Sequence, residues 1–345
     1  MTEFVVVGCG VIGLYTVACL IEKGVEPTKI SIIAEHLPGD QSIQYASPYA
    51  GAYFSASVEM ELLPYSNYTY QNLPKIQEML KNISSPIGLG MCPSTEYLDE
   101  EMSKEELDKV SEVIEDWEYL PKEKVEKISP GSKCAIKYKA WIFNSPLFIS
   151  SLLKSHKARG VSVLRKKLLN ISEAYSESTK VVFNCTGNGS ATLAGVLDVK
   201  VYPTRGQVVV ISAPHITECF SKWDDDSTYI IKRPDSQLNE VILGGFYQKN
   251  VSDATTYGYE TDDILLRTTK LYPKLLLDNP WGNTISDLQI LRVVAGARPS
   301  RNGGVRIEKE ILDKKRILIH NYGAGGCGYL SGLGMAHAAV SLLDE

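Results

Sequence analysis

Three glycines near the start of the chain have the spacing of a phosphate-binding turn. Gly8, Gly10 and Gly13 follow an apolar run at residues 4–7 and open a run with helical spacing at residues 11–23. In such a turn the middle glycine lets the backbone approach a phosphate, and the last one lets the helix pack on the strand. The free N–H groups of the helix N-terminus then favour an anion. We therefore predict a nucleotide pyrophosphate here. The alternative is a structural glycine turn in another α/β protein.

Glu35 indicates which nucleotides fit. It ends a second β-rich run, residues 29–34, so the segment has strand–helix–strand order, with an acid about 20 residues after the turn. A carboxylate there can accept hydrogen bonds from both ribose hydroxyls, and this argues against a ribose 2′-phosphate. FAD and NAD both remain compatible with Glu35.

Arg298 is the candidate for binding a carboxylate. A guanidinium fork pairs with a carboxylate through two parallel hydrogen bonds. Residues 291–297 form a β-rich run, so Arg292 and Arg298 are expected on one sheet face. Pro299 holds Arg298 extended. Arg292 is either a second ligand or a structural residue.

Composition excludes several classes of function. The chain has 345 residues, a formal net charge of -5 and 44% hydrophobic residues, and its longest basic run is residues 165–167, which disfavours nucleic-acid binding. No apolar stretch approaches the roughly 20 residues that span a bilayer. The seven cysteines include no CxxC pair, so we expect reduced thiols and no metal site.

Strand and helix patterns alternate along the rest of the chain. A long loop rich in Gly, Ser, Pro and aromatic residues is expected at residues 39–55. Strands are predicted at residues 140–143, 161–164, 180–184, 207–211, 228–231, 241–247, 291–297 and 316–320. Helices are predicted at residues 64–82, 103–117, 145–159 and 332–343. The absence of a linker favours two domains that interleave along the chain.

Eight segments, in order, carry a family resemblance. They are VVVGCGVIGL (5–14), SPYAGA (47–52), FNCTG (183–187), TRGQV (204–208), YII (229–231), GG (244–245), GARPSR (296–301) and HNYG (320–323). Over nearly its whole length the chain resembles the D-amino-acid oxidases, in particular the yeast members, and the related D-aspartate oxidases. The resemblance implies FAD rather than NAD.

The resemblance also implies a fold and a set of cofactor contacts. The fold is α/β (α+β, two domains). A Rossmann-like FAD-binding domain (1–52, 153–206 and 290–345) interleaves with a mixed-sheet substrate-binding domain (53–152 and 207–289). The residues expected at FAD are Gly8, Gly10, Val11, Ile12, Gly13, Glu35, His36, Ser47, Ala50, Gly51, Ala52, Leu168, Cys185, Thr186, Gly187, Arg298, Gly323, Gly325, Gly326, Cys327, Gly328, Tyr329 and Leu330.

Four residues are implied at the substrate. Arg298 and Tyr229 hold its carboxylate, Tyr247 assists, and the Gly326 carbonyl accepts from its amine. Strand alternation predicts that both tyrosines point into one pocket; the alternative is two half-buried sheet tyrosines. Cys327 and Leu330 stand where relatives often carry aromatic or polar residues. These two positions belong to the expected floor of the pocket.

The implied reaction is oxidation of a D-amino acid, with O2 as acceptor, to a 2-oxo acid, ammonia and hydrogen peroxide. A hydride leaves Cα for the flavin, so no enzymic base is required. D-aspartate oxidase is the nearest rival, but the loop at residues 220–226 has Lys222, no arginine and three acids. A glycine or sarcosine oxidase, a flavin-binding protein without activity and, more remotely, a nicotinamide dehydrogenase are the further candidates. The family implies a peroxisomal location, although no Ser-Lys-Leu signal ends this chain, and a homodimer is possible.

Overall fold

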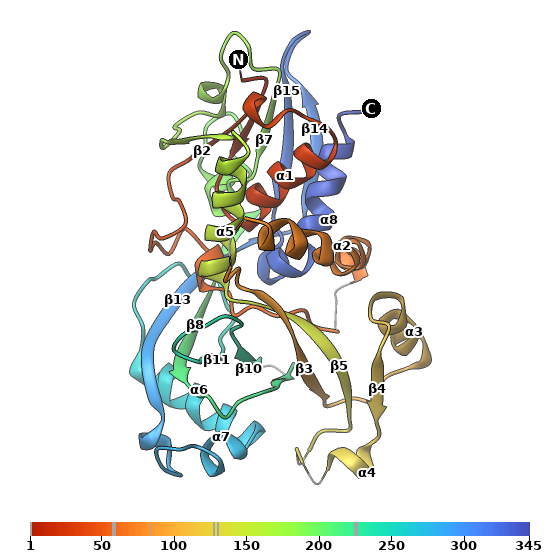
Figure 1. Ribbon diagram of the computed structural model, residues 1–345, viewed down its shortest axis with the longest axis vertical. Helices are drawn as coiled ribbons and strands as arrows, with labels where there is room; N and C mark the ends of the chain where they lie inside the picture. The colour runs from red at the N-terminus through yellow and green to blue at the C-terminus, as the bar shows by residue number, and fades with distance from the viewer. Residues whose placement is uncertain (1, 57–59, 84, 127, 130, 224–226) are drawn as a thin grey trace.

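The computed structural model describes residues 2–56, 60–83, 85–126, 128–129, 131–223 and 227–345. Two sheets lie one above the other along the long axis of the molecule, and both chain ends lie beside the upper sheet (Figure 1). The upper sheet has six strands in the order β14-β15-β7-β1-β2-β6. Its strands are β1 (Phe4–Val7), β2 (Ile30–Ala34), β6 (Ser162–Arg165), β7 (Val181–Asn184), β14 (Arg306–Ile311) and β15 (Ile317–Tyr322).

The lower sheet has nine strands, in the order β12-β8-β11-β10-β9-β3-β5-β4, with β13 also paired to β8. They are β3 (Leu89–Leu98), β4 (Trp117–Leu120), β5 (Cys134–Phe143), β8 (Val201–Ser212), β9 (Cys219–Lys222), β10 (Thr228–Lys232), β11 (Glu240–Gly244), β12 (Gln248–Lys249) and β13 (Gln289–Arg301). The helices are α1 (Val11–Glu22), α2 (Leu63–Lys81), α3 (Lys104–Val113), α4 (Lys122–Val125), α5 (Ser145–Ala158), α6 (Gly258–Leu271), α7 (Lys274–Leu277) and α8 (Gly328–Ser341).

The predicted strand–helix–strand unit at the N-terminus is confirmed. β1 lies between β2 and β7 and is parallel to both. Residues 5–7 are buried because helices cover the sheet, which explains why β1 is a continuous apolar run rather than an alternating one. The carboxyl ends of β1, β2 and β7 therefore meet at one edge of the sheet.

The chain moves repeatedly between the two sheets. β3 to β5 lie in the lower sheet, β6 and β7 in the upper, β8 to β13 in the lower, and β14 and β15 in the upper again. The strands of the two sheets are therefore interleaved along the chain. The residue boundaries of the two domains stay a prediction, and the boundary expected at residue 290 falls inside β13, which pairs with β8 in the lower sheet.

Several predicted elements need correction. The helix expected at residues 103–117 ends at Val113, because Trp117 begins β4, which pairs with β5. The strand expected at residues 241–247 ends at Gly244. β3, β9, β14 and α6 were not predicted. In β3 the cause is composition, since Gly90, Pro93 and Glu96 interrupt any alternating apolar pattern.

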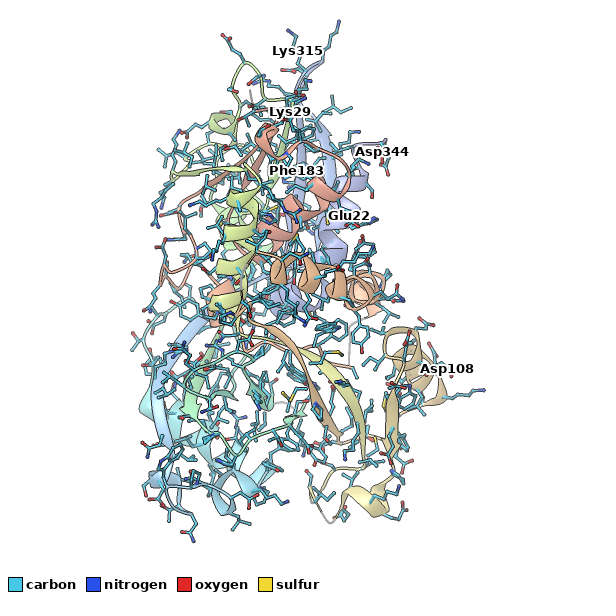
Figure 2. All side chains as sticks on the ribbon, in the orientation of Figure 1. Glu22, Lys29, Asp108, Phe183, Lys315 and Asp344 are labelled. Carbon is cyan, nitrogen blue, oxygen red and sulfur yellow. The ribbon has the colours of Figure 1, made fainter. Side chains whose placement is uncertain are left out.

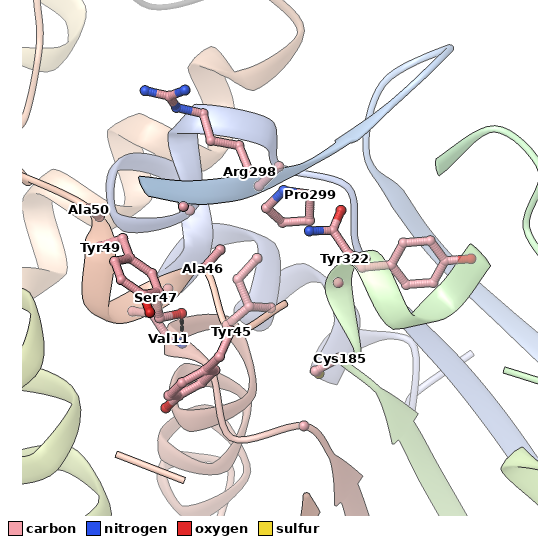
Figure 3. A pocket seen from close by; sticks show the side chains of 18 of the residues that line it. Val11, Tyr45, Ala46, Ser47, Tyr49, Ala50, Cys185, Arg298, Pro299 and Tyr322 are labelled. Atoms are coloured by element: carbon pink, nitrogen blue, oxygen red, sulfur yellow. Dashed lines mark hydrogen bonds between the residues drawn. The ribbon is translucent and has the colours of Figure 1, made fainter. Parts of the chain in front are cut away.

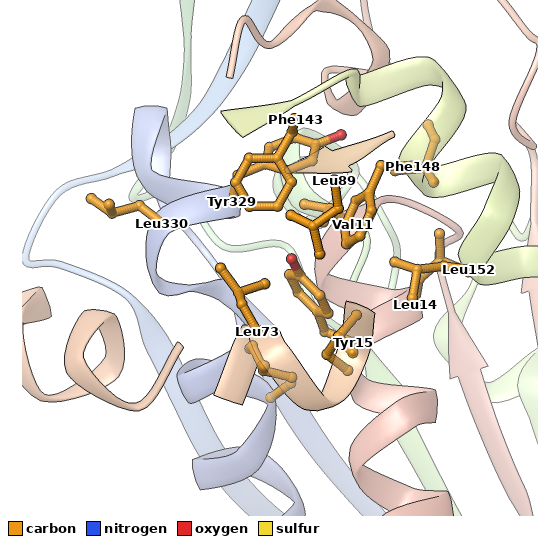
Figure 4. Packing of buried hydrophobic residues seen from close by; sticks show 14 of the residues in the cluster. Val11, Leu14, Tyr15, Leu73, Leu89, Phe143, Phe148, Leu152, Tyr329 and Leu330 are labelled. Atoms are coloured by element: carbon orange, nitrogen blue, oxygen red, sulfur yellow. The ribbon is translucent and has the colours of Figure 1, made fainter. Parts of the chain in front are cut away.

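The main core lies where helices pack between the sheets. Tyr15 of α1, Phe148 of α5 and Tyr329 of α8 meet there, and Phe143 at the end of β5 contacts both Phe148 and Tyr329 (Figure 4). Phe183 of β7 is also interior, whereas charged side chains such as Lys315 lie at the periphery (Figure 2). In the part of the chain that is described, we find no helix with the length and apolarity to cross a bilayer.

Phe148→Ala tests this packing. Phe148 is fully buried among three aromatic rings, so its truncation leaves a cavity and we expect a loss of about 3–5 kcal/mol in the free energy of unfolding. Urea unfolding followed by circular dichroism measures it. The control Leu266→Ala, at a side chain that is 60% exposed on α6, should cost less than about 0.5 kcal/mol. Equal losses would contradict the assignment of the core.

Candidate functional site

One cavity of about 760 Å³ gathers almost all the predicted site residues. Its walls come from the turn after β1, the end of β2, residues 44–55, the segments after β6 and β7, and residues 321–330, with further side chains from the lower sheet. Of the residues predicted at the cofactor or substrate, each lines this cavity except Gly13. Segments far apart in sequence therefore converge on one site.

The three glycines of the turn serve different purposes. Gly8 has φ +112°, and a Cβ there would collide with the backbone carbonyl of Cys185 at the end of β7. A Cβ at Gly13 would collide with the Gly8 carbonyl, so Gly13 fixes the helix against the strand without reaching the cavity. A Cβ at Gly10 would stand only 3.0 Å from the Ser47 hydroxyl and would occupy the cavity wall.

The N-terminus of α1 faces the cavity. The Val11 N–H donates to the Ser47 hydroxyl oxygen at 2.9 Å, which leaves the Ser47 proton available to an acceptor in the cavity (Figure 3). The first N–H groups of a helix have no partner within the helix, and they carry a partial positive charge. This end of the cavity is suited to a pyrophosphate.

Glu35 marks the nucleotide end of the cavity. Its carboxylate forms an exposed ion pair with Lys167 at 2.9 Å, and both residues line the wall. His36 stacks on Tyr45, whose hydroxyl donates to the Cys9 carbonyl at 2.7 Å. Cys185 is buried, and burial raises the pKa of its thiol to about 12, so it acts as a neutral wall.

The segment of Ala50 and Gly51 is held by a buried arginine that sequence reasoning missed. Arg233, just after β10, donates to the Gly51 carbonyl at 3.2 Å and to the Ala50 carbonyl at 3.3 Å. Its charge is balanced by Glu240 at 3.1 Å, which also pairs with Arg292 at 2.6 Å. Arg292 is therefore a structural residue rather than a second ligand.

Arg298 lies on β13 and lines the same cavity, across from Val11 in the close-up view (Figure 3). Its guanidinium donates to the Phe246 carbonyl at 3.0 Å and lies 4.2 Å from the centre of the Tyr247 ring. A Cβ at Gly206 of β8 would collide with this guanidinium. The glycine of the TRGQV segment thus makes room for Arg298. The neighbouring Arg205 is fully buried in an ion pair with Glu260.

Tyr229 stands beside Arg298. On β10 it lies opposite Gly244 of β11, and a Cβ on Gly244 would collide with the Tyr229 ring. Burial raises the pKa of the Tyr229 hydroxyl, although the charge of Arg298 acts in the opposite direction. Tyr229 is therefore a protonated donor at neutral pH.

Tyr247 reaches the same pocket by a route that the sequence did not predict. It follows the end of β11 and precedes β12, so strand alternation does not orient it. Its hydroxyl lies over Gly326, where a Cβ would collide with it, and its ring covers Arg298. The four residues predicted at the substrate are thus brought together.

Tyr53, Ser55 and Trp223 are among the lining residues that the sequence analysis missed. Tyr53 and Ser55 fall at the end of the predicted loop, and Trp223 follows β9. Trp223 stacks against Tyr53 at 6.4 Å and meets Tyr229 at 6.1 Å. The sequence does carry a signal for them, because aromatic residues stand beside the SPYAGA segment (47–52) and shortly before the YII segment (229–231). Asp224, Asp225 and Asp226, which weighed against D-aspartate, lie outside the described residues.

The chain matches a known family over almost its whole length. Residues 3–342 match the family described as FAD dependent oxidoreductase. The chain belongs to this family. It is 36% identical to a D-amino-acid oxidase of Schizosaccharomyces pombe, over 99% of this chain and 95% of the relative. It is 30% identical to a D-aspartate oxidase of Cryptococcus neoformans, over 98% and 95%.

The fold is also that of a solved glycine oxidase from Bacillus cereus. The TM-score is 0.77 and the identity 17%, with 100% of this chain and 95% of the other covered. At that identity the likeness concerns the fold alone. The expected α/β architecture is confirmed.

The residues present fit FAD. Gly8 and Gly10 leave the turn open, the start of α1 offers N–H groups, and Glu35 lines the same cavity, where its carboxylate could accept from ribose hydroxyls. A Cβ on Gly51 would come within 2.7 Å of Ile231, so this lining segment packs on β10 more closely than a side chain would allow. Cys327 and Leu330, the two departures from the family pattern, both line the cavity.

Gly8→Ala tests this cradle. The added methyl group meets backbone rather than a movable side chain, so we expect the dissociation constant for FAD to rise at least about tenfold, a loss of about 1.4 kcal/mol. Titration of the apoprotein, followed by flavin fluorescence, measures it. The matched control is Gly24→Ala, which also has positive φ (+94°) but open space around it. It should strain the backbone without changing FAD affinity. An equal loss in both would show that backbone strain alone is responsible.

Proposed function

We propose that this protein is a D-amino-acid oxidase. The observation that carries the proposal is the pairing of Arg298 with Tyr229 in the cavity that also holds the nucleotide cradle. A guanidinium and a protonated phenol together match an α-carboxylate. The Tyr247 hydroxyl and the Gly326 backbone stand beside them and complete the substrate site.

Bound FAD would supply the redox chemistry, taking two electrons from the substrate and passing them to O2. The protein's own residues bind and orient. Arg298 and Tyr229 would fix the carboxylate, and the Gly326 carbonyl would accept from the amine. The aromatic rings of Tyr247 and Trp223 would exclude water from the reacting carbon.

The substrate end offers binding groups rather than a base. Among the described residues of the cavity wall, the carboxylate and the imidazole are Glu35 and His36, both in the segment that follows β2. Tyr229 is held protonated by burial. This arrangement supports hydride transfer, in which no side chain has to remove the Cα proton.

A neutral substrate is favoured over D-aspartate. Lys222, the candidate cation for a second carboxylate, pairs with Asp99 at 2.9 Å and is not among the described residues of the cavity wall. The cations of that wall are Lys166, Lys167 and Arg298. A peroxisomal location and a homodimer stay predictions drawn from the family.

A hydrogen peroxide assay over a panel of D- and L-amino acids tests the proposed function. Peroxide from D-alanine and not from L-alanine is expected. Equal rates with glycine and D-alanine would favour a glycine oxidase, and a higher kcat/KM for D-aspartate would favour a D-aspartate oxidase. A yellow protein that releases no peroxide from any of them would be a flavin-binding protein.

Arg298→Ala should lower kcat/KM for D-alanine by about 10²–10³-fold, because removing one partner of a buried charge pair costs about 2–5 kcal/mol. Steady-state peroxide release measures the loss. Arg292→Ala, on the same strand but paired with Glu240, should stay within about threefold of the wild type. Similar losses in both variants would remove the special role of Arg298.

Tyr229→Phe should lower kcat/KM by about 10–100-fold, because a hydrogen bond to a charged group contributes about 1.5–3 kcal/mol. The pKa of Tyr229 is raised, so its proton stays in place as the pH increases through neutrality. The ratio of wild type to variant should therefore be constant between about pH 6 and pH 9. A ratio that shrinks toward pH 9 would mean that Tyr229 ionises there.

A further inference from the structure

An arginine outside the cavity wall contacts the chain on either side of the Tyr229 pair. Arg267 lies on α6, with a side chain that is 14% exposed, and it is not among the described residues that line the cavity. Its guanidinium donates to the Thr228 hydroxyl at 2.7 Å and to the Gly245 carbonyl at 3.0 Å. Its Nε donates to the carboxylate of Asp263, one turn earlier on α6, at 2.7 Å. The proposed function uses none of these contacts.

The two acceptors of this guanidinium flank the Tyr229 hydroxyl. Tyr229 on β10 is the partner of Gly244 on β11, so Thr228 and Gly245 lie one residue further along the two segments, on the same side of this pair. A Cβ at Gly245 would come within 2.5 Å of the Tyr229 hydroxyl. The Gly245 N–H also donates to the Ser227 carbonyl at 2.9 Å. A guanidinium that joins Thr228 to Gly245 therefore fixes the backbone beside this hydroxyl.

The segment held by Arg267 continues to the groups that contact Arg298. Phe246 follows Gly245, and its carbonyl accepts from the Arg298 guanidinium at 3.0 Å. The guanidinium of Arg267 lies 5.4 Å from the centre of the Phe246 ring. Tyr247 comes next, and the centre of its ring lies 4.2 Å from the Arg298 guanidinium. A shift of residues 245–247 would therefore change the surroundings of Arg298 as well as those of Tyr229.

The planar fork of an arginine is suited to this bridge. Its N–H donors point in fixed directions, and here different nitrogens serve Asp263, Thr228 and Gly245. Asp263 has a side chain that is 43% exposed, so it orients the fork from the solvent side. A lysine would keep the charge, but its ammonium group is a point charge on a flexible stem and cannot hold the same three acceptors in these directions.

We propose that Arg267 is a positioning residue for the substrate carboxylate. By joining β10 to residues 245–247, its guanidinium holds Tyr229 and Arg298 in the arrangement that receives the carboxylate. The inference rests on the proposed oxidase activity and deepens it, because it gives a part in substrate binding to a residue of α6 outside the cavity wall. An arginine that only attached α6 to the sheet would stabilise the fold without changing the affinity for substrate.

The first test is Arg267→Met in the holoenzyme, with peroxide release normalised to bound flavin. The KM for D-alanine should rise about tenfold and kcat should stay within about threefold of the wild type, because the carboxylate is held alike in the ground state and the transition state. A purely structural role would lower the fraction of folded, flavin-loaded enzyme and leave KM unchanged. An Arg267→Met enzyme with the wild-type flavin spectrum and the wild-type KM overturns the proposal.

Two milder variants separate the fork from the charge and from the ion pair, and they also serve if Arg267→Met does not load FAD. Arg267→Lys keeps the charge near Tyr229 but not the fork, so KM should again rise about tenfold. The matched control, Asp263→Asn, breaks the same ion pair from the solvent side and leaves the donors to Thr228 and Gly245 in place, so KM should stay within about threefold. A wild-type KM in Arg267→Lys, or an equal rise in Asp263→Asn, overturns the proposal.

A double variant tests whether Arg267 acts through the carboxylate-binding residues. Residues that act as a unit have non-additive effects, so Arg267→Met should lower kcat/KM by about threefold or less when Arg298→Ala is already present. A further loss of about tenfold in that background would make the two effects independent and would overturn the proposal.

The two levels of inference fail separately. Oxidation of D-alanine by the wild type, with an unchanged KM in Arg267→Met, overturns the role of Arg267 alone. A lack of peroxide from the wild type with every D-amino acid overturns the proposed function itself.

Discussion

The close crossing of two backbone segments at Gly8 is the constraint on which the site depends. The end of β1 passes so near the carbonyl of Cys185, at the end of β7, that no side chain fits between them. Gly13 brings α1 equally close to the turn. Because these strands are parallel and adjacent, their carboxyl ends open onto the same edge, and the start of α1 points its N–H groups there. Any Cβ at this crossing would push apart the elements that form the cradle.

The lower sheet contributes charged side chains to a site whose backbone is formed mainly by segments of the upper sheet. Arg298 is placed by β13, given room by Gly206, and covered by Tyr247. A half-buried guanidinium needs partners for its donors, and here one partner is the Phe246 carbonyl. The Tyr229 hydroxyl is a second partner, and both side chains line the cavity. Arg205 differs from Arg298 because its donors are used by Glu260 and by backbone carbonyls.

Charged groups of both signs line the cavity. The start of α1 is electropositive, Arg298 adds a cation, and Glu35 adds an acid. Arg233 donates to the carbonyls of Ala50 and Gly51, and so fixes a segment that lines the same cavity.

The sequence by itself determined the nucleotide half of this protein. Contiguous patterns were enough there: a strand, three glycines at fixed spacing, a helix and an acid, all within residues 4–35. The eight segments that occur in order along the chain also indicated the family, and they indicated Arg298 as a ligand of the substrate carboxylate. Only the tertiary structure decided that Arg292 is structural, that Tyr247 arrives from outside its strand, and that Arg233 and Arg267 hold segments next to the site. The physical reason is that these roles depend on which strands become neighbours. Thr228 and Gly245 are not neighbours in the sequence, yet the pairing of β10 with β11 brings both within reach of Arg267, and no local pattern of residue types encodes that register.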